Sequence, residues 1–108
     1  MTPQPDPAQP DPVLSTTTRL SLVAFLAATT EADFASVRDA VGLTDSNLSK
    51  HATALEAAGY ISVRKGYVGR RPRTWLALTP AGRTALKIHV AALNAILAHT
   101  GEELARPT

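Results

Sequence analysis

LTDSNLSKH, residues 43–51, reads as the start of a helix with two different sides. Thr44 is a typical N-cap residue, and Asp45 suits the positive end of the helix dipole behind it. Just before this stretch, Gly42 is placed to end a shorter helix, which we expect over residues 35–41. The sequence therefore predicts two helices joined by a tight turn of four residues.

The helix that starts at Asp45 should end near residue 58, because Gly59 follows. With about 100° between successive residues, Leu48, Ala52 and Leu55 fall on one side and are predicted to be buried. A helix, a short glycine-containing turn and a second helix are the layout of a helix-turn-helix. We therefore interpret residues 45–58 as a recognition helix.

The side opposite the buried stripe is polar, and its residues are small. Asn, Lys, Ser and Thr are the types that hydrogen-bond to base edges or phosphates. An ordinary solvated helix is the alternative, but Ser, Thr and Asn are weak helix formers and would serve it poorly. The predicted DNA-reading residues are Thr44, Ser46, Asn47, Ser49, Lys50 and Thr53.

After Gly59 the apolar residues alternate, which favours strands over residues 60–65 and 74–78. We expect a basic, glycine-bearing loop, residues 66–73, to join them as an extended hairpin tip. Arginine can grip phosphates or enter a narrow minor groove, whereas a solvated charged loop is the alternative. Trp75 is expected in the core or an interface, and Tyr67 either stacks on a sugar or covers the hairpin. The predicted DNA contacts of this basic wing are Arg64, Lys65, Arg70, Arg71 and Arg73.

Two further helices flank these elements. The first should run from residues 15–17 to about 28, and the last over residues 80–99, with Thr79 as N-cap and Pro80 in the first turn. The last helix has two apolar stripes, and one domain covers only one of them, so a second subunit is expected to cover the other. The predicted dimer interface comprises Leu20, Leu86, Val90, Leu93, Ile96 and Leu97.

The formal net charge of the 108-residue chain is only +2, but its charges are unevenly placed. Residues 44–87 carry eight basic side chains and two acidic ones, a net charge of +6, and residues 57–101 contain no acid. Solvated surface charge alone would mix the two signs. A basic centre that contains both the polar helix and the hairpin favours a nucleic-acid partner.

The first twelve residues contain five of the eight prolines and almost nothing apolar. We therefore expect residues 1–14 to be a disordered leader and residues 15–106 to form one domain. The chain has no cysteine, no membrane-length apolar run and no signal-peptide pattern, so a reducing, cytoplasmic location is expected. We expect no cofactor.

In this order, the motifs LTDSNLSKH (43–51), LEAAGYI (55–61), GRRPRTW (69–75) and LTPAGR (78–83) resemble the winged helix-turn-helix of bacterial transcriptional regulators, close to the MarR and ArsR types. The resemblance implies an α+β, mainly helical fold with a three-helix core, a β-hairpin wing and a long C-terminal dimerisation helix. The homodimer expected from the two apolar stripes would bind a double-stranded DNA operator with its two recognition helices about one DNA turn apart. The resemblance also suggests an unidentified small-molecule effector, although no residue of the sequence indicates its site. Ala52 departs from the leucine often found in relatives, and the missing cysteines argue against metal sensing.

Other function classes fit less well. We find no nucleophile elbow, phosphate loop, zinc motif or carboxylate pair, so an enzyme is not expected. A winged-helix protein-interaction scaffold or a non-specific nucleic-acid-binding protein remains the alternative to a sequence-specific regulator. We expect His51 to be a packed histidine, hydrogen-bonded within the domain, and His89 and His99 to make a poor metal site.

Overall fold

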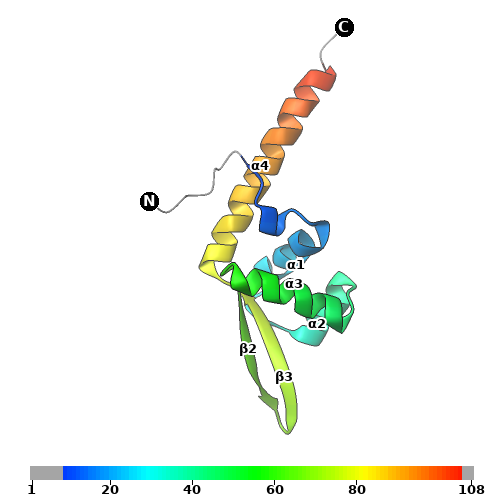
Figure 1. Cartoon of the computed structure of the whole chain (residues 1–108), viewed down its shortest axis with the longest axis vertical. Coiled ribbons are helices and arrows are strands. Elements are labelled where there is room, and N and C mark those ends of the chain that lie inside the picture. Colours follow the sequence, from blue (N-terminus) through cyan, green and yellow to red (C-terminus); the bar gives the residue numbers. More distant parts are fainter. Residues whose placement is uncertain (1–8, 106–108) are drawn as a thin grey trace.

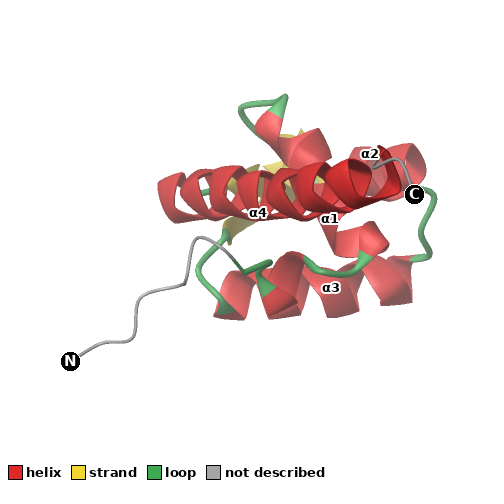
Figure 2. Ribbon diagram, turned by 90° about the horizontal axis from the view of Figure 1, so that it is seen from above, coloured by secondary structure: helices red, strands yellow, loops and turns green. Residues whose placement is uncertain are grey.

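The computed structural model describes residues 9–105, and the side chains of residues 9–99. Four α-helices and a three-stranded antiparallel sheet make up the described chain (Figure 1). Their order is a 3-10 turn (Pro12–Leu14), α1 (Thr17–Ala27), β1 (Ala32–Asp33), α2 (Phe34–Val41), α3 (Asp45–Ala57), β2 (Ile61–Val68), β3 (Arg71–Leu78) and α4 (Pro80–Ala105). From above, helices form most of the molecule (Figure 2). This is the expected α+β winged helix-turn-helix.

One apolar core joins the helices to the base of the hairpin. The predicted inner stripe of α3 is confirmed, since Leu48 and Leu55 are fully buried and Ala52 is nearly so. Their main partners are buried residues of the N-terminal turn, α1, α2 and the sheet: Leu14, Leu22, Val23, Leu26, Val37, Ile61 and Leu76. This packing fixes which side of α3 faces solvent.

Local chemistry sets the end of α2 and the start of α3 where the sequence predicts them. The Thr44 hydroxyl accepts a hydrogen bond from the Asn47 N–H (3.1 Å) and so caps α3. Gly42 follows α2 at φ 75°, a left-handed conformation that glycine adopts without strain. The turn between α2 and α3 is therefore built as expected.

The hairpin differs from the prediction of a basic loop over residues 66–73. Strands β2 and β3 remain paired as far as Val68 and Arg71, so only Gly69 and Arg70 form the turn. Gly69 has φ 63° and Arg70 does not have a positive φ, the sign pattern of a type II′ turn. The backbone ladder continues beyond the buried residues because its hydrogen bonds do not require a core.

The sequence analysis also missed a strand. β1 is only two residues long and pairs with β3, aligning Ala32 with Leu76 and Asp33 with Trp75. It makes β3 the central strand of the sheet. So short a segment shows no alternating pattern, and only its tertiary partner reveals it.

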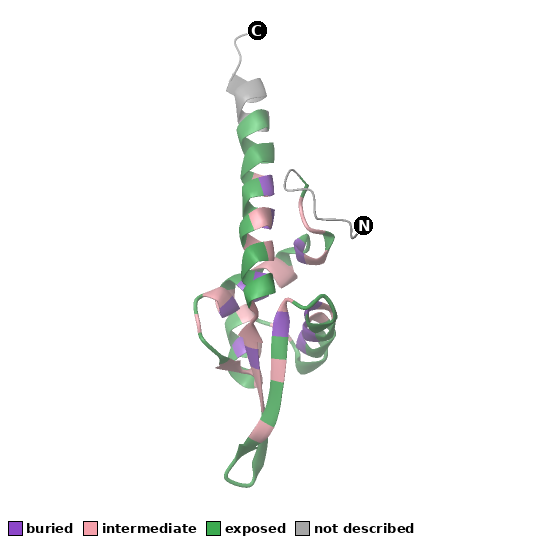
Figure 3. Ribbon diagram, turned by 90° about the vertical axis from the view of Figure 1, so that its left-hand side faces the viewer, coloured by how far each residue is buried: buried purple, intermediate pink, exposed green. Residues whose placement is uncertain are grey.

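The start of the predicted domain and the end of its last helix require correction. Part of the supposed leader folds: residues 12–14 form a 3-10 turn, and Leu14 is fully buried. The domain therefore begins before residue 15, while residues 1–8 lie outside the described chain. Helix α4 continues to Ala105 rather than residue 99. Residues 94–99 of α4 and the hairpin tip are exposed (Figure 3). No described helix is long and apolar enough to cross a membrane.

Candidate nucleic-acid interface

Helix α3 presents its predicted DNA-reading side to solvent. The whole set is exposed: Thr44, Ser46, Asn47, Ser49, Lys50 and Thr53. Two of these hydroxyls already bond to the helix backbone, since Thr44 caps α3 and the Thr53 Oγ1 donates to the Ser49 carbonyl (2.8 Å). Thr44 keeps its hydroxyl proton for a phosphate, whereas Thr53 keeps acceptor capacity.

Two arginines hold α3 at its start and at its middle. Arg38 of α2 pairs with Asp45 (2.8 Å) and with Asp39 (2.9 Å), so the first turn of α3 is tied to α2. On the other flank, the Arg19 Nε donates to the His51 Nδ1 (3.1 Å). His51 is thus a half-buried, hydrogen-bonded histidine, as predicted. Burial and the nearby Arg19 charge lower its pKa.

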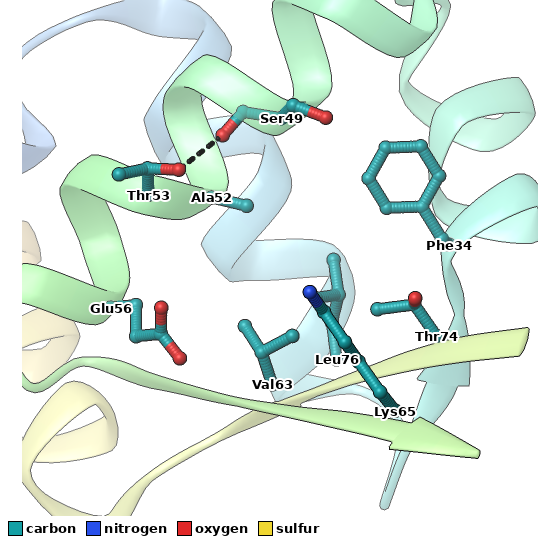
Figure 4. Close-up of a pocket in the computed structure, with 9 residues that line it drawn as sticks. All are labelled: Phe34, Ser49, Ala52, Thr53, Glu56, Val63, Lys65, Thr74 and Leu76. Carbon is teal, nitrogen blue, oxygen red and sulfur yellow. Dashed lines mark hydrogen bonds between the residues drawn. The ribbon is translucent and has the colours of Figure 1, made fainter.

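A cleft of about 350 Å³ separates α3 from the hairpin (Figure 4). Ser49, Thr53 and Glu56 line it from α3, and Lys65 and Thr74 from the hairpin. Ala52, Val63, Leu76 and the Phe34 ring supply its apolar part. The small side chain at position 52, the departure noted in the sequence, lies beside this open space.

The basic residues of the wing divide between two faces of the hairpin. Successive side chains in a strand point to opposite faces, so Lys65 lies on the cleft side, with Val63. The same alternation puts Arg71 and Arg73 on the other face, with Arg64. Lys65 is therefore the wing cation nearest to α3.

Arg64 has a structural environment that its sequence did not reveal. Its guanidinium lies 4.0 Å from the centre of the Trp75 ring. It also donates from Nε and Nη2 to both carboxylate oxygens of Glu31 (3.1 and 2.7 Å). This hydrogen bonding raises the pKa of Arg64 and lowers the pKa of Glu31. Arg64 therefore has a neutralising partner, and we no longer assign it to a phosphate.

Arg70, Arg71 and Arg73 are exposed at the hairpin end. Among the described side chains, the salt bridges of the wing are limited to the Arg64–Glu31 pair. Asp33 lies near Arg73: hydrogen bonding to Ser36 is the main cause of its lowered pKa, and attraction by Arg73 adds to it. The positive charge of the tip is thus less compensated than that of the base.

The predicted dimer residues lie in two environments. Leu86 packs against the core of its own domain, and Leu20 and Leu93 are half-buried. Val90, Ile96 and Leu97 are 41%, 47% and 67% exposed. The exposed apolar residues of the predicted interface therefore lie between positions 90 and 97 of α4, the helix that extends beyond the body of the domain (Figure 1).

Sequence reasoning missed a polar cluster at the N-terminal segment. His89, dismissed as a metal ligand, is 1% exposed, and its Nδ1 accepts the Asp11 N–H (2.9 Å). The Asp11 carboxylate accepts the Tyr60 hydroxyl. These residues are far apart in the chain, so no spacing could have indicated them. Within the described residues, no three His, Asp or Glu side chains form a metal site.

Comparison with known proteins agrees with this geometry. The family model of the winged helix DNA-binding domain matches residues 18–97. MJ0432, an uncharacterised protein of Methanocaldococcus jannaschii, is 27% identical over 78 residues, which cover 72% of this chain and 85% of that protein. A transcriptional regulator homologue from Pyrococcus horikoshii superposes with a TM-score of 0.75 at 28% identity, covering 82% of this chain and 87% of its own.

A third similar structure is BpsR of Bordetella bronchiseptica, with a TM-score of 0.67 at 22% identity. The match covers 86% of this chain and 69% of BpsR. The fold and the polar helix beside a basic hairpin define a DNA-binding transcriptional regulator. The chain belongs to the family of winged helix DNA-binding domains.

Proposed function

We propose that the protein binds a specific operator in double-stranded DNA as a homodimer. In each subunit, α3 enters the major groove, and Ser46, Asn47 and Lys50 contact base edges. Thr44, Ser49 and Thr53 contact phosphates or base edges at the margin of the groove. Arg70, Arg71 and Arg73 at the hairpin tip contact the minor groove or the adjacent phosphates, with Lys65 on the α3 side.

The observation that carries this proposal is the exposed, polar side of α3 next to a basic hairpin tip whose positive charge is only slightly compensated. The inner side of α3 is buried, so the outer side is fixed toward solvent. A protein-interaction scaffold has no need for either feature. A non-specific binder needs the basic tip but not Asn47 and Lys50 on one helix face. We propose that the protein has no enzymatic activity and that it acts in the cytoplasm.

The homodimer is supported by the exposed apolar residues of α4. Val90, Leu93 and Leu97 recur at helical spacing, so they form one stripe. A second copy of α4 would remove this stripe from water and place the two recognition helices about one DNA turn apart.

We also propose that a small molecule regulates DNA binding. A cavity of about 270 Å³ lies between the N-terminal segment and α4, lined by Asp11, Pro12, Tyr60, Ala85 and Ile88 among others. In BpsR, DNA binding is regulated by 6-hydroxynicotinic acid. An effector of this protein would likewise regulate its binding to DNA.

Selection of bound fragments from genomic DNA, followed by titration of the selected operator and of shuffled DNA by fluorescence anisotropy, tests the proposal. We expect the operator to bind at least about 1,000-fold more tightly than shuffled DNA of equal length. Equal affinities would indicate the non-specific alternative. No binding to either DNA at low salt would indicate a scaffold.

A further inference from the structure

Asp11 connects three parts of the molecule. Its N–H donates to the His89 Nδ1 of α4 (2.9 Å), and its Oδ2 accepts the hydroxyl proton of Tyr60. Its Oδ1 accepts the Val13 N–H (2.8 Å), and its carbonyl accepts the Ser15 hydroxyl (2.6 Å), which orders the turn before α1. One residue of the N-terminal segment thus contacts α4, the link after α3 and the start of α1.

The two long-range partners are held firmly. His89 is buried, and because its Nδ1 accepts a hydrogen bond, the neutral ring carries its proton on Nε2. Tyr60 stands two residues after the C-cap of α3, and burial together with the Asp11 bond raises its pKa to about 12. Asp11 therefore lies between the end of the recognition helix and α4.

Hydrogen bonds and close contacts hold helix α4 near its start and at its middle, in addition to the packing of Ala85 and Leu86 against the core. At its start, the Thr79 hydroxyl donates to the Gly59 carbonyl (2.6 Å), and Gly82 lies directly against the Tyr60 carbonyl. The contact at its middle is made by His89, seven residues further on. His89 lies further from the base of α4 than Ala85 and Leu86, so the bond from Asp11 to His89 adds to the resistance of α4 against tilting about its base.

We propose that Asp11 is a positioning residue that sets the distance between the two recognition helices of the dimer, and thereby the spacing of the operator half-sites. The inference rests on the proposed homodimer. A helix of 26 residues is about 39 Å long, so a tilt of about 10° moves its far end by about 7 Å. That displacement is about two base pairs of DNA.

Hydrogen bonds from Arg19 also connect this N-terminal segment to α3. The Arg19 Nη1 donates to the Val13 carbonyl (3.5 Å), while its Nε donates to His51 on α3. The turn that holds α4 through Asp11 therefore also touches, through Arg19, the helix that reads DNA. A loosened turn affects the angle between α3 and α4 rather than the reading side of α3.

The test uses the full chain and the selected operator, with base pairs inserted or deleted between the half-sites. Three variants weaken this set of hydrogen bonds: Tyr60→Phe removes the hydroxyl donor, Asp11→Ala removes the carboxylate that accepts this proton and the Val13 N–H, and His89→Leu removes the Nδ1 acceptor. We expect the wild type to lose at least about tenfold in affinity for each change of two base pairs. In the variants this preference should fall below about threefold, while binding to a single half-site stays within about twofold of wild type.

Two comparisons distinguish this role from a general effect on folding. His89→Asn keeps an acceptor near the Nδ1 position and should retain the spacing preference, whereas His89→Leu should lose it. Ala91→Gln, at an exposed position of α4, is the matched control and should behave as wild type. Circular dichroism and thermal unfolding establish that each variant is folded at the assay temperature.

The outcomes separate the two proposals. Folded, dimeric variants that keep the wild-type spacing preference overturn the role of Asp11 and leave the homodimer intact. A wild type that is monomeric by light scattering, or that binds all spacings equally, overturns the homodimer and this inference with it. Equal losses for single half-sites and full operators would show a general defect, which also contradicts the proposal.

Discussion

The guanidinium of Arg64 lies 4.0 Å from the centre of the Trp75 ring, while two of its nitrogens donate to Glu31. Glu31 immediately precedes β1, so this contact joins the base of the hairpin to the segment before α2. Gly66 completes the arrangement, since a Cβ there would lie 3.1 Å from the Trp75 ring. Arg64 thus helps to fix the orientation of the hairpin, while the positive charge available to DNA lies at the hairpin tip.

The different roles of Arg64 and of the arginines at the hairpin tip predict that their variants change the salt dependence of DNA affinity differently. Changing Arg70, Arg71 and Arg73 together to Gln should weaken binding to every sequence. If all three contact phosphates, the slope of log affinity against log salt should flatten by about 2.7, because each contact contributes about 0.9. Arg64→Gln should leave the slope unchanged, although the less firmly held wing lowers affinity.

Anisotropy titrations at four or more salt concentrations measure these slopes. Lys87→Gln, an exposed charge change on α4 outside the proposed interface, is the control. A flattened slope for Arg64→Gln would return that residue to the phosphate contacts. An unchanged slope for the triple variant would remove the wing from the mechanism.

Base reading by α3 predicts a second, sequence-dependent pattern. Asn47→Ala or Lys50→Ala should cost about 1 to 3 kcal/mol of binding free energy on the intact operator. On operators already changed at the contacted base pair, the further loss should be small, because that contact is no longer available. Ala57→Ser, an exposed change at the end of α3, is the control. Equal losses on all sequences would show that Asn47 and Lys50 only position the protein.

The contrast between α3 and Arg64 shows what the sequence could and could not predict. Leu48, Ala52 and Leu55 follow the helical period, so the buried side of α3 and its exposed opposite side could be deduced directly. Arg64 reads as one more cation of the wing, because its partner Glu31 is 33 residues away and joins it only through the fold.

The same limit applies to the missed elements. β1 is too short to show a period, and its position depends on pairing with β3. The N-terminal segment is rich in proline and reads as unfolded, yet Leu14 is buried and Asp11 bonds to residues 49 and 78 positions away. The periodicity of residues along the chain predicts local secondary structure, whereas these contacts depend on which distant segments meet in the fold.

Gly82 offers a test of the packing between α4 and the hairpin. In an ordinary helix, Gly→Ala stabilises by about 1 kcal/mol. Here the new Cβ would overlap the Tyr60 carbonyl oxygen and lie 2.7 Å from the Leu78 Cδ1. We therefore expect Gly82→Ala to lower the free energy of unfolding by about 2 to 3 kcal/mol, measured by urea denaturation. A stabilised variant would show that α4 does not pack this closely on the hairpin.

His51 predicts how stability depends on pH. Burial and Arg19 hold its pKa below the ordinary value of about 6.5, so the folded state binds a proton less readily than the unfolded state. Its contribution to the free energy of unfolding is therefore present above about pH 6.5 and is lost as the pH falls toward the lowered pKa. His51→Asn keeps an acceptor for Arg19 without titrating. This variant should lose less stability than wild type between pH 7.5 and about pH 5.5, and equal losses would contradict the assignment.

The exposed stripe of α4 predicts the effect of a charge on assembly. Leu97→Glu places a carboxylate beside Val90 and Leu93 on the proposed dimer interface. Association would remove this charge from water, and the cost of its desolvation opposes dimerisation. We expect a monomer by light scattering at micromolar concentration, where the wild type is a dimer. Affinity for the full operator should fall at least about 100-fold as the linked second half-site is lost, while affinity for a single half-site stays near that of wild type. Ala95→Glu introduces the same charge on the opposite side of the helix and should remain dimeric. A dimeric Leu97→Glu protein with unchanged operator affinity would show that this stripe does not hold the two subunits together.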